Sequence, residues 1–109
     1  MELKNINTSP IDWDNINPVE TKGETGINIS REINLDNIRL RISEYSVNYK
    51  SAEWCNKGHI IHCIEGEMTI HLKSGNSIKL AAGYSLVLGE NDSHIGVTGN
   101  SSAKIFIVD

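Results

Sequence analysis

The feature that most constrains the fold is a series of short apolar segments broken by glycine turns, which runs from residue 27 to residue 108. Apolar and polar residues alternate in these segments, as in strands with one buried face, and no window of a dozen residues keeps a helical period. Turns are expected at residues 65–67, 74–76 and 81–83, where Gly or Asn tolerates a positive φ. The expected strands are residues 27–30, 38–43, 58–64, 68–73, 78–80, 85–88, 94–97 and 103–108.

Strands at this spacing predict an all-β sandwich or barrel, and a count of about eight suits a jelly roll. A chain of 109 residues is the size of one domain with one hydrophobic core. We therefore expect a single barrel over residues 27–109. Residues 1–26 contain both prolines and several Asn- and Asp-rich turns, and are expected to form an irregular N-terminal arm.

Charge and hydropathy exclude several classes of partner. The net charge is −4 and the ten basic residues form no run, so nucleic acid is not an expected partner. No apolar stretch approaches the ~20 residues that cross a bilayer, and the polar N-terminus lacks the apolar segment of a signal peptide. We expect a cytoplasmic protein without a membrane partner. A reducing compartment disfavours a disulfide between Cys55 and Cys63, which leaves free or metal-bound thiols.

The spacing of residues 53–66 resembles the first motif of the cupin superfamily, G-x5-H-x-H-x3,4-E-x6-G. Anchoring this motif on Gly66 places its Glu at His59 and its two His at Cys55 and Glu53. Its leading Gly falls at Val47, which is a departure from the pattern.

Residues 83–98 resemble the second cupin motif, G-x5-P-x-G-x2-H-x3-N, in spacing more than in residue type. With Gly83 as its first residue, the Pro, Gly, His and Asn of the motif fall in turn at Gly89, Asn91, His94 and Thr98.

The resemblance implies a cupin-type double-stranded β-helix, a jelly-roll barrel whose four ligand positions converge on one metal ion. Those positions hold Glu53, Cys55, His59 and His94, and each is a metal-ligand type. Two imidazoles, a thiolate and a carboxylate suit tetrahedral Zn²⁺ best, with Fe²⁺ or Ni²⁺ as alternatives. Four protein ligands would make a closed structural site, whereas three would leave a position for water or substrate.

A closer resemblance covers nearly the whole chain. The segments at residues 22–26, 54–59 and 104–109 are similar to a small cupin family named for an Asp, His, Cys and Trp motif, for which we know of no assigned biochemical role. The chain keeps Trp54 and Cys55 but has Ala52 and Glu53 where the Asp and His are expected.

Each candidate ligand also has a purely structural interpretation. Cys55 can be a small core residue, His59 a hydrogen-bonded core histidine, and Glu53 a solvent-facing strand end. The aromatic candidates for the pocket can equally be packing residues with a polar handle. The residues expected to line the pocket, and to hold an anionic or planar ligand there, are Arg41, Tyr45, Tyr49 and Trp54, with Cys63 as a further candidate.

Three functions remain open from the sequence. The first is a metal-binding cupin whose barrel holds a small-molecule ligand, with or without turnover. The second is a metal-free module that binds a small ligand as a sensor or store. The third is a redox-responsive protein that uses Cys55 with Cys63. The resemblance to cupins also implies a homodimer.

Overall fold

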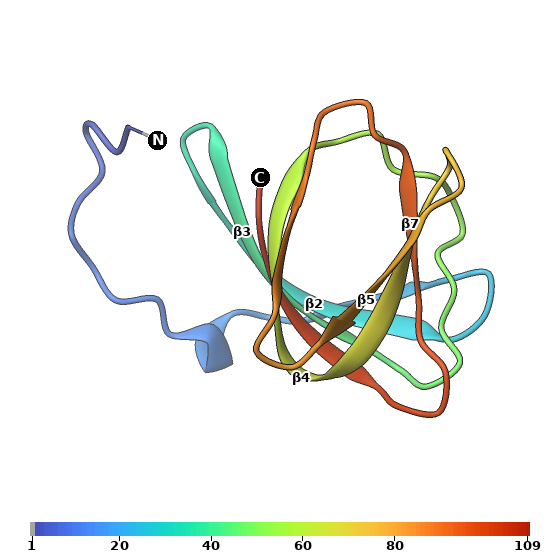
Figure 1. The fold of residues 1–109 in the computed structure, drawn as a ribbon. Coiled ribbons are helices and arrows are strands. Elements are labelled where there is room, and N and C mark those ends of the chain that lie inside the picture. The colour runs from blue at the N-terminus through green and yellow to red at the C-terminus, as the bar shows by residue number, and fades with distance from the viewer. Residues whose placement is uncertain (1) are drawn as a thin grey trace.

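The computed structural model describes residues 2–109, which form eight β-strands and a three-residue 3₁₀ helix (Figure 1). None of these residues lies in an α-helix, so the expected all-β class is confirmed. No helix within this range is long and apolar enough to cross a membrane. The elements are η1 (Trp13–Asn15), β1 (Val19–Lys22), β2 (Ile27–Leu35), β3 (Ile38–Tyr45), β4 (His59–Leu72), β5 (Ser77–Ala81), β6 (Ser85–Leu88), β7 (His94–Val97) and β8 (Ala103–Val108).

Strand β4 belongs to two sheets and joins them into a barrel. Its first half pairs with β6 and β8, and β8 continues through β3 and β2 to the edge strand β1. Its second half pairs with β5 and β7 instead. All pairings are antiparallel, and the ribbons close into the ring seen in Figure 1. This is the jelly-roll arrangement that the strand spacing predicts.

Gly66 marks the point where β4 passes from one sheet into the other. The prediction of a turn at residues 65–67 is wrong, because β4 runs unbroken for 14 residues. Gly66 does have the positive φ, 73°, that a turn glycine would have. Here it accompanies a bulge, because the pairing with β8 shifts register between Cys63 and Glu65. Strand β8 pairs on both sides of this bulge, so the chain bends without reversing.

The other two turns are confirmed. Residues 74–76 connect β4 to β5, with His71 opposite Ser77, and Gly75 has a φ of 119°. Residues 81–83 connect β5 to β6, with Gly83 at a φ of 91°.

The core fills the barrel interior through strict alternation along the strands. In β8, Ala103, Ile105 and Ile107 are buried, while the residues between them are only half-buried. In β4 the same period of two holds on each side of the bulge, with Ile61 and Cys63 buried before it and Met68 and Ile70 after it, so the bulge shifts the buried parity by one residue. The buried apolar cluster consists of Ile61, Cys63, Met68, Ile70, Leu80, Leu88, Ala103, Ile105 and Ile107.

The N-terminal arm is irregular over most of its length and lies beside the barrel in Figure 1. The expectation for residues 1–26 missed two elements, the short helix η1 and the strand β1, which pairs with β2 from Val19 to Lys22. Trp13 anchors the arm by packing edge-to-face against Phe106 of β8, with ring centroids 6.3 Å apart.

Substituting Gly66 by Ala tests the bend in β4. A Cβ at this position would lie 1.8 Å from the carbonyl oxygen of Ser102 and would also strain a positive φ. We expect a loss of at least about 3 kcal/mol in the free energy of unfolding, measured by urea denaturation. Gly75→Ala is the matched control, since its φ is also positive but nothing lies within 4 Å of the added Cβ. Its loss should be about 1–2 kcal/mol, and equal losses would contradict the steric argument.

Candidate metal centre

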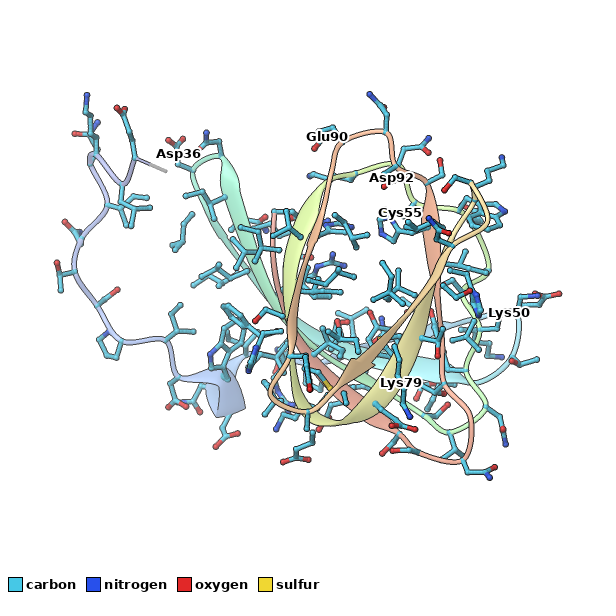
Figure 2. All side chains as sticks on the ribbon, viewed as in Figure 1. Asp36, Lys50, Cys55, Lys79, Glu90 and Asp92 are labelled. Atoms are coloured by element: carbon cyan, nitrogen blue, oxygen red, sulfur yellow. The ribbon has the colours of Figure 1, made fainter. Side chains whose placement is uncertain are left out.

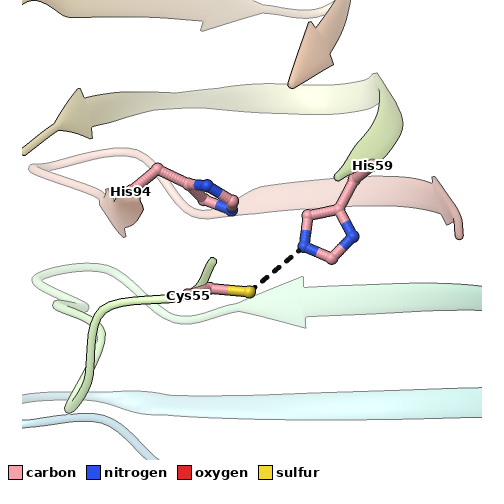
Figure 3. A group of neighbouring side chains, drawn as sticks. All are labelled: Cys55, His59 and His94. Atoms are coloured by element: carbon pink, nitrogen blue, oxygen red, sulfur yellow. Dashed lines mark hydrogen bonds between the residues drawn. The ribbon is translucent and has the colours of Figure 1, made fainter. Parts of the chain in front are cut away.

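Three side chains with metal-ligand atoms converge at one place inside the barrel: Cys55, His59 and His94 (Figure 3). One ligand atom from each lies within 4.8 Å of the others. The Sγ of Cys55 lies 3.4 Å from Nε2 of His59, and the two imidazole rings meet edge-to-face with centroids 5.2 Å apart. Both histidines are buried, while Cys55 is half-buried.

Backbone pairing fixes Cys55 opposite His94. Cys55 lies in the loop between β3 and β4, and its N–H donates to the carbonyl of His94 at 2.9 Å. The N–H of His94 returns a bond of 3.0 Å to the carbonyl of Cys55, which makes an isolated antiparallel bridge. The two motifs therefore meet through the main chain, and Figure 2 shows Cys55 at the end of the barrel that carries Glu90 and Asp92.

Each histidine is oriented through its Nδ1, which leaves Nε2 for the cluster. Nδ1 of His94 lies 3.0 Å from the carbonyl oxygen of Asp92. Nδ1 of His59 lies 2.8 Å from Oδ2 of Asp109, but the ring is not aligned for a hydrogen bond, so this is a close electrostatic contact. Metal-binding histidines commonly contact a carboxylate or a backbone carbonyl in this way.

Asp109 is a buried carboxylate held by two arginines. Its side chain is 1% exposed and accepts two hydrogen bonds from Arg39, at 2.8 and 2.7 Å, while Arg41 lies 3.4 Å away. Burial alone would raise the pKa of Asp109, but the hydrogen bonds and charge of Arg39, helped by Arg41 and His59, lower it to about 2. Asp109 is therefore ionised beside His59.

The surroundings keep His59 neutral. Burial lowers the pKa of His59, and although Asp109 opposes this, Arg41 and His94 lower it further. A neutral imidazole is the form that binds a metal ion. The carboxylate of Asp109 is thus ionised and the neighbouring imidazole of His59 is neutral, the combination that suits a metal-binding histidine.

A cavity of about 310 Å³ opens beside the cluster. Cys55, His59 and His94 all lie in its wall. The rest of the wall is mostly apolar, with one arginine and two tyrosines among the polar lining residues. Its other lining residues include Arg41, Tyr45, Tyr49, Ser51, Glu53, Ile61, Met68, Ile70, Leu88, Ile105 and Ile107.

The other residues that the sequence predicts for the pocket are found in different places, some in the cavity wall and some outside it. Glu53 lies in the cavity wall but is exposed, and its carboxylate is not part of the three-residue group. Arg41, Tyr45 and Tyr49 line the cavity. The lining does not include Trp54, which is 44% exposed with Lys73 over its ring.

Cys63 is also absent from the cavity lining, because the bulge in β4 encloses it in the core. Its thiol donates to the carbonyls of Glu65 and Gly66 at 3.3 and 3.5 Å. Burial raises the pKa of this thiol. An enclosed, protonated thiol gives no support to a redox pair with Cys55.

Sequence reasoning missed Asp109 and Arg39. The available signal was the alternation in β3, which places Arg39 and Arg41 on one face. Two arginines on a face that turns inward need an internal counter-charge. Only the antiparallel pairing of β3 with β8 shows that Asp109, at the end of β8, supplies it.

The donor set fits a divalent metal ion. Two ligands of one tetrahedral Zn²⁺, a nitrogen at ~2.1 Å and a sulfur at ~2.3 Å, lie about 3.5 Å apart. The observed separation of 3.4 Å between Sγ of Cys55 and Nε2 of His59 matches this value. The group formed by Cys55, His59 and His94 can therefore hold a metal ion.

Searches of family models and of curated proteins found no match to this chain. Solved structures do match. A predicted oxalate decarboxylase from Thermotoga maritima superposes with a TM-score of 0.77 at 14% identity, over 92% of this chain and 96% of its own. A polyketide cyclase from Streptomyces resistomycificus gives 0.76 at 19% identity, over 93% of this chain and 78% of its own.

A further similar structure is a sugar phosphate isomerase from a cupin superfamily, from Silicibacter pomeroyi. Its TM-score is 0.72 at 14% identity, over 92% of this chain and 74% of the isomerase. These similarities, together with the barrel topology, establish that the protein has the cupin fold. The fold is the one that the resemblance in the sequence implies.

The substitution Arg39→Met tests the buried ion pair. It leaves the carboxylate of Asp109 buried with the 3.4 Å contact to Arg41 as its one contact to a charged arginine, beside the neutral ring of His59. Because an uncompensated buried charge is costly, we expect a loss of about 2–3 kcal/mol in the free energy of unfolding. Lys79→Met breaks the exposed pair with Glu67, whose two side chains are 66% and 45% exposed, and should cost less than about 1 kcal/mol. Urea denaturation of both variants checks this, and similar losses would contradict it.

Proposed function

We propose that this cupin-type barrel binds one divalent metal ion through Cys55, His59 and His94, and holds a small molecule in the adjoining cavity. The observation that carries the proposal is the joint orientation of the three side chains. Sγ of Cys55 faces Nε2 of His59, Nδ1 of His94 pairs with the carbonyl of Asp92, and Nδ1 of His59 lies 2.8 Å from the carboxylate of Asp109. A barrel with no metal has no evident need for this arrangement.

Zn²⁺ is the ion that this donor set favours, with Fe²⁺ or Ni²⁺ as alternatives. One thiolate and two imidazoles form a borderline-soft set. Three protein ligands would leave a fourth position for water or for a ligand from the adjoining cavity, as in catalytic zinc sites rather than structural ones. When bound, such an ion polarises a carbonyl group or lowers the pKa of a bound water molecule.

The residues of the chain itself would position the ligand. The apolar part of the wall would exclude water from the ligand. Tyr45 and Tyr49, whose rings meet edge-on with centroids 4.9 Å apart, would add aromatic contact surface. Glu53 is the carboxylate of the cavity wall and is our candidate for a general base. The similar solved structures are described with unlike reactions, so we assign no reaction from the fold.

Metal binding is tested by titrating the chelator-treated protein with Co²⁺. We expect one ion per chain and a thiolate-to-cobalt charge-transfer band, because Cys55 would be a ligand. Cys55→Ser should abolish the band, and His94→Ala should weaken binding by at least about 100-fold, since losing even a supporting residue costs 10–100-fold. His62→Ala is the matched control, because His62 lies on β4 with the opposite parity to His59.

The control variant should bind Co²⁺ as the unmodified protein does. A folded protein that binds no ion would contradict the proposal and would favour the alternative, a metal-free module that binds a small ligand. A Co²⁺ site that persists in both Cys55→Ser and His94→Ala would place the metal elsewhere.

We also propose that the protein is a homodimer, as the resemblance to cupins implies. Ile60 of β4 and Val87 of β6 are cross-strand partners, and they are 53% and 74% exposed. An apolar groove of about 400 Å³ continues from them toward Ile38 and Val108. Burying such a face against a second copy would remove apolar surface from water.

Sedimentation velocity at micromolar concentration checks the dimer. We expect a dimer for the unmodified protein and a monomer for the double variant Ile60→Glu/Val87→Glu, because charges on this face oppose its burial. Val19→Glu, on the edge strand β1 and 61% exposed, is the control and should remain dimeric. A monomeric unmodified protein would rule the proposal out.

A further inference from the structure

Arg41 is an interior cation with unused hydrogen-bonding capacity. Its side chain is 20% exposed and forms part of the cavity wall. Within residues 2–109, the only acceptor for its guanidinium is Oδ2 of Asp109, at 3.4 Å, and its buried Nε has no partner. A guanidinium has five N–H donors, so most of this group's donors have no acceptor among the described residues.

Arg41 has a weaker counter-charge than Arg39. Asp109 is bound in bidentate fashion by Arg39, which also lies 3.7 Å from Glu32, whereas Arg41 has a single contact of 3.4 Å to Asp109. Glu53 and Lys22, the other charged residues of the cavity wall, are both exposed and of opposite sign. A divalent ion with the Cys55 thiolate would make the interior more positive. The cavity therefore favours an anionic occupant.

The size and lining of the cavity limit that anion. Its volume of about 310 Å³ is that of about ten water molecules at ~30 Å³ each. Apart from the metal cluster, its wall combines Arg41 and a few other polar residues (Lys22, Asn28, Ser51 and Glu53) with a larger set of apolar side chains, and Tyr45 and Tyr49 pack together within it. A planar anion with a short apolar body matches this combination of one charge and an apolar wall.

We propose that the barrel binds a small monocarboxylate, with the carboxylate on the guanidinium of Arg41 and the apolar body in the cavity beside Cys55, His59 and His94. Carboxylate and guanidinium match in geometry, since both are planar and two parallel N–H···O bonds can form between them. The inference deepens the proposed function and rests on it for the small-molecule role of the cavity. The Arg41 contact itself does not require the metal ion.

Isothermal titration calorimetry with the linear carboxylates from acetate to hexanoate, each compared with its primary amide, tests this assignment. The amide keeps the shape and removes the charge. We expect the best carboxylate to bind at least about tenfold more tightly than its amide, and Arg41→Met to remove this preference. Arg31→Met is the matched control, because Arg31 binds the carbonyl of Ile16 and lies outside the cavity wall.

The calorimetric titrations of the unmodified protein and of the variants are made with Zn²⁺ present and repeated after the metal has been removed by a chelator. Near-ultraviolet circular dichroism and the Co²⁺ spectrum confirm that Arg41→Met folds and keeps its metal site. If this variant does not fold, Arg41→Lys replaces it. A lysine keeps the charge but loses the bidentate geometry, so the carboxylate preference should fall by at least about threefold.

The outcomes separate this inference from the metal proposal. A preference that depends on Arg41 in a protein that binds no metal supports the inference and rejects the metal site. A preference that survives in Arg41→Met but disappears on chelation assigns the carboxylate to the metal and overturns the inference. A loss of preference in Lys22→Met instead of Arg41→Met overturns it too, as does the absence of any preference across the series.

Discussion

The ion pair between Arg39 and Asp109 is the interaction on which the rest of the site depends. It joins β3 to the end of β8, and the same carboxylate contacts His59 at the start of β4. Three strands distant in sequence are thereby held around one buried charge. Because Asp109 is almost fully enclosed, this charge is stable only while Arg39 remains bidentate, so the orientation of His59 is coupled to the closure of the barrel.

The interior of this barrel is unusual in combining an apolar core with a charged upper layer. Below, Leu80 and Ile105 are almost fully enclosed by other apolar side chains. Above, Arg41 of β3 lies in the cavity wall, and Arg39, on the same face of the strand, binds the buried carboxylate of Asp109. The cavity, the cluster of Cys55, His59 and His94, and the cation of Arg41 thus lie at the same end of the barrel. That concentration of polar groups in an enclosed space is the physical basis for assigning a binding function to it.

Much of the site was predictable because motif spacing encodes strand register. Cys55, His59 and His94 meet although the residue types of the motifs have changed, since antiparallel pairing depends on residue count. Glu53 satisfied the same spacing, yet its exposed carboxylate stays outside the cluster, because the loop before β4 is not held in regular pairing there. Trp54 and Cys63 were expected at the cavity and lie outside it, one on the surface and one in the core.

The sequence by itself determined the all-β class, the position of most strands and most of the turns, because alternation and turn chemistry are local properties. The cluster residues came from the spacing of the cupin motifs, which counts residues along paired strands. Only the tertiary structure decided that Gly66 bends β4 instead of ending it, since that depends on β8 pairing on both sides of the bulge. The tertiary structure also decided that the face of β3 with Arg39 and Arg41 points inward, and that the carboxylate of Asp109 supplies their counter-charge. Local alternation defines two faces of a strand, but the identity of the inner face depends on partners far away in the chain.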